Sequence, residues 1–206
     1  MAVWNLETEG EREAIQSLAK ESDRGVAIIA ASFLEGRLQQ GIIAKLRNDK
    51  KIIDDLFSSV GAIGAFGTKI RIGFLLRLYG AQVFKELNII CKIRNKFAHI
   101  IGEREVLSFK SESIVSQCNN LKIIEHYVRP LSESTFGGPF NGVVEATRES
   151  GSIFCSDFAE KLSDARYRYE NTCGLLAERF QKPGQTRDPQ LPDEFLILGD
   201  EAYPLP

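Results

Sequence analysis

The chain has 206 residues, of which 43% are hydrophobic, with 26 basic and 28 acidic side chains and a net charge of −2. This length and apolar content suffice for one buried core, which excludes a chain that is disordered throughout. The balanced charge excludes an overall field that would draw the protein to DNA or to an acidic membrane, so any nucleic-acid role needs a local basic patch.

The N-terminal segment "MAVWNLETEGERE" is acidic and lacks the basic-then-apolar order of a secretion signal, and the apolar run "VAIIAASFL" is too short to span a bilayer. Cys91, Cys118, Cys155 and Cys173 are far apart and form no C-x-x-C pair, which favours reduced, buried thiols over disulfides or metal ligands. We therefore expect a cytoplasmic protein with no membrane segment, no metal and no cofactor.

Two helices are predicted in the first 80 residues. Ser22 is a suitable N-cap, and apolar residues recur after it at helical spacing to about Arg47. The short apolar segment "KIIDDLF" then leads into the glycine-rich stretch "SSVGAIGAFG", which favours a loop. A second helix is predicted from Thr68, as its cap, to Tyr79, and Gly80 suits the left-handed turn that ends it.

Three further helices are predicted in the rest of the chain. Residues 81–99 form the third helix, as an antiparallel hairpin with its predecessor, and residues 111–128 form the fourth, which Pro130 ends. A loop rich in Gly, Ser and Pro follows at 130–152. Apolar residues at steps of three and four over 154–180 then predict a final helix of roughly seven or eight turns.

The fold class predicted from these elements is all-α, an up-and-down helical bundle with a long C-terminal helix and an extended C-terminal tail. A single helical-bundle domain is expected over residues 1–182. Residues 183–206 carry five of the seven prolines and are expected to lie extended on the surface or on a neighbouring subunit.

The stretch "KIRNKFAHIIG" at 92–102 contains the most informative polar residues. Arg94 falls on the apolar face of its helix, so it should point inward and needs a partner for its buried charge. Asp23, on the core-facing side of the first long helix, is the first choice for an Arg94–Asp23 ion pair, and Glu35 is the second. His99 falls on the polar face, about 140° from Arg94, where a partly cationic side chain suits the negative helix end.

Three separated blocks, "ESDRGVAIIAASFLEGRLQQGIIAKL", "FGTKIRIGFLLRLYG" and "FKELNIICKIRNKFAH", resemble the mannitol operon repressor family of bacterial regulators. The resemblance covers about residues 21–125. It implies an all-helical fold, a role in regulating a sugar-alcohol operon, and action through a protein partner such as a transcription factor, because this family lacks a recognisable DNA-binding motif. It also favours a homodimer.

The segment "RNKFAH" is also similar to the R-x4-H signature of the HEPN superfamily (higher eukaryotes and prokaryotes nucleotide-binding), helical bundles of which many are metal-independent ribonucleases. By that resemblance, Arg94 would hold the scissile phosphate of an RNA. His99 would move protons to and from the attacking 2′-hydroxyl and the leaving group, and Asn95 would orient the site.

A row of lysines gives a possible basic surface. Between 67 and 99 seven basic residues face a single acid, and Lys85, Lys92 and Lys96 share the polar side of their helix. Such a row would follow a phosphate backbone, although it is also typical of the solvated face of an amphipathic helix.

Direct DNA binding is disfavoured. The hairpin at Gly80 superficially resembles a helix-turn-helix, but its second helix is almost five turns long and has the apolar face of a central bundle element. The sequence therefore favours a mannitol operon repressor-like regulator that acts through protein partners over an enzyme. The alternative is a HEPN-type ribonuclease that uses Arg94 and His99.

Overall fold

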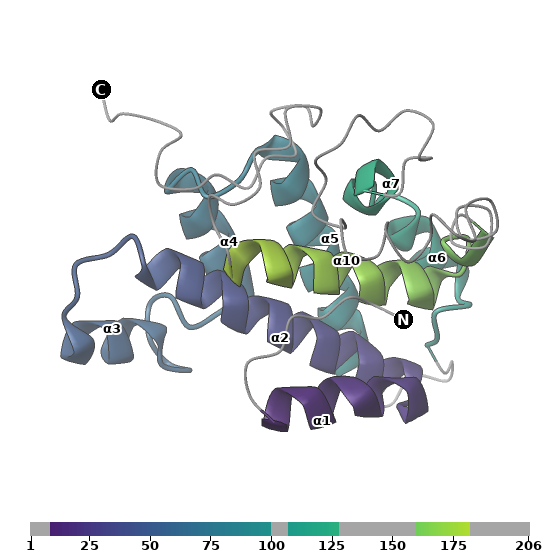
Figure 1. Cartoon of the computed structure of the whole chain (residues 1–206), viewed down its shortest axis with the longest axis horizontal. Helices are drawn as coiled ribbons and strands as arrows, with labels where there is room; N and C mark the ends of the chain where they lie inside the picture. Colours follow the sequence, from purple (N-terminus) through teal and green to yellow (C-terminus); the bar gives the residue numbers. More distant parts are fainter. Residues whose placement is uncertain (1–8, 100–106, 128–159, 182–206) are drawn as a thin grey trace, which may run out of the picture.

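The computed structural model describes residues 9–99, 107–127 and 160–181, and its regular elements in these ranges are all helical (Figure 1). The helices are α1 (Glu9–Ser17), α2 (Asp23–Ile43), α3 (Lys50–Phe57), α4 (Phe66–Leu75), α5 (Ala81–His99), α6 (Glu112–Cys118), α7 (Ile123–Tyr127) and α10 (Ala165–Gln181), with a 3-10 turn at Leu18–Lys20. The predicted all-α class is confirmed. The predicted C-terminal tail lies outside the described residues.

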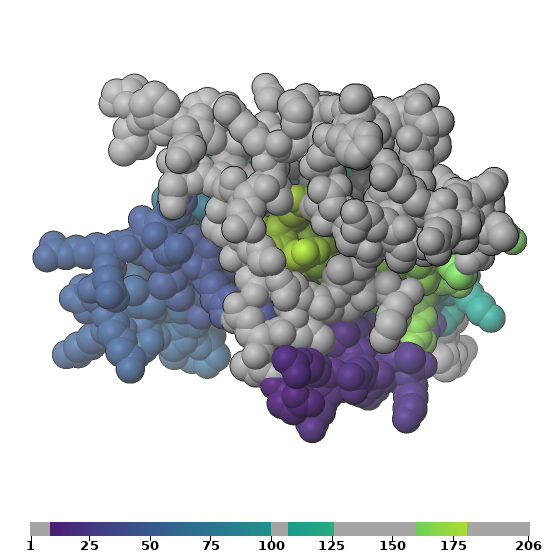
Figure 2. All heavy atoms as spheres, viewed as in Figure 1, coloured from purple at the N-terminus to yellow at the C-terminus, as the bar shows by residue number. Residues whose placement is uncertain are grey.

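Helix α2 is the central element, and α1, α4, α5 and α10 all pack against it (Figure 1). Its N-terminus is the predicted one, because the Ser22 hydroxyl accepts the N–H of Gly25 at 3.1 Å. Helix α10 runs parallel to α2: Asp23 pairs with Arg166 where both helices begin, and the C-terminal turns of the two helices also meet. Helix α3 lies at one end, away from α1 and α10 (Figure 2).

The predicted antiparallel hairpin of α4 and α5 is present. The rings of Phe74, in the last turn of α4, and Phe84, in the first turn of α5, lie 4.6 Å apart. Helix α5 is also antiparallel to α2, since Arg24 at the start of α2 donates to the carbonyl of Ala98 at the end of α5.

Small side chains on α2 allow α10 to approach closely. Ala27, Ala30 and Ala31 are fully buried, and the hydroxyl of Tyr169 on α10 donates to the Ala27 carbonyl at 2.9 Å. Larger apolar residues on the same helix are also buried in the core, namely Leu34, Leu38 and Ile42. Burial of this surface supplies most of the stability of a helical bundle.

The second predicted helix is shifted relative to its expected bounds. It begins at Phe66, with Ala65 rather than Thr68 at the N-cap, and ends at Leu75. The end is a Schellman motif, in which Arg77 takes the left-handed conformation (φ 58°) in place of Gly80, and the N–H of Leu78 donates to the Gly73 carbonyl at 3.0 Å. The local sequence offered a glycine for this turn, but backbone hydrogen bonds place the turn three residues earlier.

The fourth predicted helix, 111–128, is wrong as a single element, because the chain breaks between α6 and α7. The cause is Glu86 on α5. One of its carboxylate oxygens accepts the N–H groups of Lys122 and Ile123 at 2.9 and 2.8 Å, which caps the N-terminus of α7. A carboxylate more than thirty residues away therefore supplies the partner that ends one helix and begins the next.

The two ends of the described chain also differ from the prediction. The final helix predicted over 154–180 is wrong as a single element, because residues 162–164 form a turn, and α10 begins at Ala165, where Asp164 accepts the N–H of Tyr167 at 2.8 Å and caps it. The predicted start at 154 lies outside the described residues. Helix α1 was not predicted, since none of its side chains is buried. A carboxylate of Glu11 reaches the buried Arg37 of α2 with both oxygens at 3.1 Å.

The described cysteines agree with the expected reduced state. Cys91, Cys118 and Cys173 are free thiols, and burial raises the pKa of the Cys118 thiol to about 12. Cys155 lies outside the described residues.

Candidate functional site

Arg94 is an ion-pair partner between helices, but its partner is not the first choice from the sequence. Its Nη2 lies 2.7 Å from Oε2 of Glu35 on α2, the second choice, and the Arg94 side chain is 26% exposed. The guanidinium also stacks over the ring of Phe66 at 5.7 Å. The arginine therefore joins α5, α2 and the start of α4.

Glu35 forms ion pairs with two cations at once. Its other carboxylate oxygen lies 2.7 Å from Nζ of Lys69 on α4, whose side chain is only 7% exposed. We call the set of Glu35, Lys69 and Arg94 the Glu35 junction. A carboxylate between two cations offsets much of the desolvation cost of bringing them under the surface.

The predicted Arg94–Asp23 pair is wrong. Asp23 instead pairs with Arg166 of α10 at 3.0 Å and accepts the N–H of Phe109 at 2.8 Å. Asp23 and Glu35 are twelve residues apart on α2, which is roughly 18 Å along the helix axis and about 120° around it. Asp23 therefore faces Arg166 of α10, whereas Glu35 faces Lys69 of α4 and Arg94 of α5.

A shallow pocket of about 400 Å³ lies beside the Glu35 junction. Arg94, Asn95 and Cys91 line it from α5, and the segment 64–67 lines it at the start of α4. Asn95 accepts a hydrogen bond from Arg94 at 3.0 Å, and its amide lies 3.8 Å from the Cys91 sulfur. Burial raises the pKa of the Cys91 thiol, an effect that the nearby Arg94 charge opposes.

The structure does not join His99 to this pocket. His99 is the last residue of α5, and its side chain is exposed and absent from the pocket lining. Arg94 and Asn95 are thus brought together, whereas the third residue of the R-x4-H pattern lies apart from them. His99 keeps the helix-end position predicted for it.

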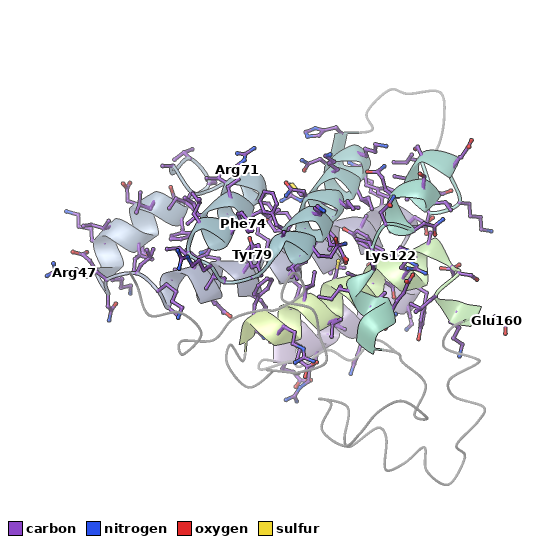
Figure 3. The ribbon with its side chains drawn as sticks, turned by 90° about the horizontal axis from the view of Figure 1, so that it is seen from above. Arg47, Arg71, Phe74, Tyr79, Lys122 and Glu160 are labelled. Atoms are coloured by element: carbon purple, nitrogen blue, oxygen red, sulfur yellow. The ribbon has the colours of Figure 1, made fainter. Side chains whose placement is uncertain are left out.

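A second hollow, of about 540 Å³, lies between α5 and the turn from α6 to α7. We call it the lysine groove. Phe84 and Ile89 contribute apolar surface, and Lys85, Lys92 and Lys122 contribute charge. Lys122 lies just before α7 (Figure 3). Two of the three predicted basic residues therefore line one groove, and the third, Lys96, is exposed outside its lining.

Sequence reasoning missed three residues that shape these sites: Lys69, Glu86 and Lys122. Lys69 was counted among the basic residues but not expected to be buried. Glu86 had one available signal, since it is the single acid between 67 and 99. It is fully buried, so the solvent-facing side of α5 carries no carboxylate, and burial raises its pKa.

Within the described ranges, no group of three or more His, Cys, Asp or Glu side chains is placed to hold a metal ion. No helix among these residues is long and apolar enough to cross a membrane.

Comparisons with known proteins bear on the fold. No model of a known protein family and no curated protein matches the sequence. Among solved structures, a chain of the X-ray structure of the MtlR-HPr complex from Escherichia coli matches with a TM-score of 0.56 and 14% identity, over 85% of this chain and 100% of that chain. At this identity the likeness shows that the chain has an MtlR-like fold.

Proposed function

We propose that this chain is a mannitol operon repressor-like transcriptional regulator, acting in the cytoplasm as a homodimer through protein partners rather than by binding DNA directly. The observation that carries the proposal is the match of an entire chain of the MtlR-HPr complex to this fold. In that structure MtlR is in a complex with the protein HPr. The three sequence blocks that resemble the family form α2, α4 and α5, the centre of the bundle.

The surface chemistry supports protein contacts over DNA contacts. The net charge of −2 gives no long-range attraction to a duplex. Helix α5, the second helix of the hairpin that superficially resembles a helix-turn-helix, packs against α2, α4, α6 and α7. The turn from α6 to α7 lies beside the solvent-facing side of α5, where a recognition helix must be free to enter the major groove.

The test is a titration of the purified chain with Escherichia coli HPr in a calorimeter, beside a gel-shift assay with operator DNA. We expect complex formation with a Kd of about micromolar, as for transient regulatory contacts, and no shift of DNA at sub-micromolar protein. Sedimentation of the free chain should give a dimer. A salt-dependent shift of operator DNA together with no heat of HPr binding would contradict the proposal.

A HEPN-type ribonuclease is the second candidate, and one observation favours it: Arg94 and Asn95 meet at a pocket on the surface. Against it stand the pairing of Arg94 with Glu35 and the separate position of His99. Incubation with single-stranded RNA, beside a His99→Ala variant, separates the two functions. Cleavage that His99→Ala abolishes would support the ribonuclease, and an inactive unmodified protein would exclude it.

A further inference from the structure

The lysine groove has an unusual charge balance for a surface between helices. Lys85 and Lys92 are exposed and have no carboxylate partner among the described residues. The nearest acid along the helix, Glu86, points into the bundle and is fully buried. Lys122 is paired with Glu125 at 3.1 Å across one exposed turn, which leaves a net positive groove.

The amide side chains that line the groove limit which hydrogen-bonding groups a ligand must carry. Asn88 and Asn120 each donate through the amide nitrogen to a carbonyl of their own helical turn, at 2.7 and 2.8 Å. Gln82 donates to the Glu86 carboxylate at 3.0 Å. Each bond uses one of the two N–H groups of its amide, and no described residue donates to the three amide oxygens, which remain acceptors for a ligand.

These acceptors distinguish between two kinds of anionic ligand. A polypeptide brings backbone N–H donors in a regular series together with carboxylates for the lysines. A phosphodiester backbone carries negative charge but no N–H donors. The hydrogen-bonding groups therefore suit a peptide better than a nucleic acid.

The apolar part of the groove extends this match. Phe84 and Ile89 line it, and Phe84 stacks on Phe74, which is 37% exposed at the end of α4 (Figure 3). Leu75, which follows Phe74 in α4, is 74% exposed. An apolar strip with a cationic border is the surface that binds amphipathic acidic segments.

We infer that the lysine groove is a docking site for an acidic segment of a partner protein, in which carboxylates alternate with large apolar side chains. The carboxylates pair with Lys85 and Lys92, the apolar side chains cover Phe84 and Ile89, and peptide N–H groups donate to the amide oxygens. This inference rests on the proposed function, because it names the site and the chemistry of one partner of a regulator that works through protein contacts.

The experiment uses the full chain and a short fluorescent synthetic peptide with Glu alternating with Leu and Phe, followed by anisotropy and by amide NMR shifts. Two control ligands are measured beside it. One is the same peptide with Gln in place of Glu, and the other is oligouridylate RNA. We expect the acidic peptide to shift amides of α5 and of residues 119–123, and to bind at least about tenfold more tightly than the Gln peptide and the RNA.

The decisive variant is the double change Lys85→Glu with Lys92→Glu. Its control is Lys50→Glu with Lys51→Glu, two exposed lysines of α3 with the same change in net charge. The groove variant should weaken peptide binding by about tenfold or more and the control by less than about twofold. Milder changes to Gln at the two groove positions should weaken it by an intermediate factor, and far-ultraviolet circular dichroism checks that each variant is folded.

Several outcomes would overturn the inference. Equal effects of the two double variants, or no peptide binding, would remove the groove as a specific site. RNA that binds as tightly as the peptide would assign the groove to nucleic acid, and a dimer that the groove variant converts to monomer would assign it to a second copy. HPr binding, measured on the same preparations, tests the proposed function separately. If the unmodified chain does not bind HPr, the proposed function is contradicted, whether or not the peptide binds.

Discussion

Two faces of α5 hold their cations in opposite ways. On the face towards α2 and α4, Arg94 meets the Glu35 carboxylate at 2.7 Å, and the same carboxylate holds the buried Lys69. On the solvent side, Lys85 and Lys92 have no carboxylate partner in the described part of the chain. The cations of the Glu35 junction are thus part of the fold, whereas the two exposed lysines are available to bind a ligand.

The difference follows from solvation. An exposed lysine keeps its water shell, so a counter-charge adds little to stability and a missing one costs little. A cation under the surface loses much of that shell, and removing its partner leaves an uncompensated charge. The Glu35 junction should therefore be sensitive in unfolding experiments, and the lysine groove in binding experiments.

The largest expected effect on stability is that of Glu35→Gln. The change removes the negative charge from between Lys69 and Arg94, and we expect the free energy of unfolding to fall by about 3 kcal/mol. Urea unfolding followed by circular dichroism measures it. Glu13→Gln on the exposed surface of α1 is the control, expected to change stability by less than about 0.5 kcal/mol. Equal losses in the two variants would remove the distinction between the two faces of α5.

A smaller effect is expected where α4 meets the core. A Cβ at Gly73 would lie 2.8 Å from the Tyr79 hydroxyl, which donates to the Ile70 carbonyl, so Gly73→Ala should cost about 2 kcal/mol. At Gly36 on α2 nothing lies within 4 Å of such an atom. Gly36→Ala should stabilise the fold by roughly 0.5 to 1 kcal/mol, because alanine is the better helix former. Thermal or urea unfolding should therefore show a lower free energy of unfolding for Gly73→Ala and a higher one for Gly36→Ala. A lower free energy of unfolding for Gly36→Ala would contradict the open space at this position.

Glu86, the buried acid of α5, should make the stability of the chain depend on pH. Burial raises the pKa of Glu86 in the folded state, so the folded chain holds this proton at a pH where the unfolded chain has released it. The contribution of Glu86 to stability should be full below its unfolded pKa and fall as the pH rises through its folded pKa. Glu86→Gln keeps an oxygen for the N–H groups of Lys122 and Ile123 and removes the titration.

Urea unfolding of the unmodified chain and of Glu86→Gln at a series of pH values tests this sign. The difference in unfolding free energy should move in favour of the variant as the pH increases from acidic to neutral. A difference that is constant with pH would show that the Glu86 carboxyl titrates alike in the folded and unfolded chain.

The smallest expected effect on stability is that of the groove variant, Lys85→Glu with Lys92→Glu. Both side chains are exposed and unpaired among the described residues, so the free energy of unfolding should change by less than about 1 kcal/mol. A loss as large as that of Glu35→Gln would mean that these lysines are part of the fold rather than a binding surface.

Local sequence patterns were sufficient to locate α2 and α5. The Ser22 cap and the apolar repeat place α2, and the range 81–99 predicted for the third helix is the range of α5. These patterns also gave the inward direction of Arg94, because the direction of a side chain follows from its place on the helix. These features depend on residues within a few positions of one another, which a single sequence displays.

Only the tertiary structure decided which groups meet across helices. Asp23 pairs with Arg166 of α10, so Glu35 rather than Asp23 is the partner of Arg94, and Glu86 of α5 interrupts the helix predicted over 111–128. That interruption also creates the turn that closes one side of the lysine groove. Helical spacing fixes the direction of a side chain around its own helix axis, whereas the helix and the residue that this side chain meets depend on how the helices pack.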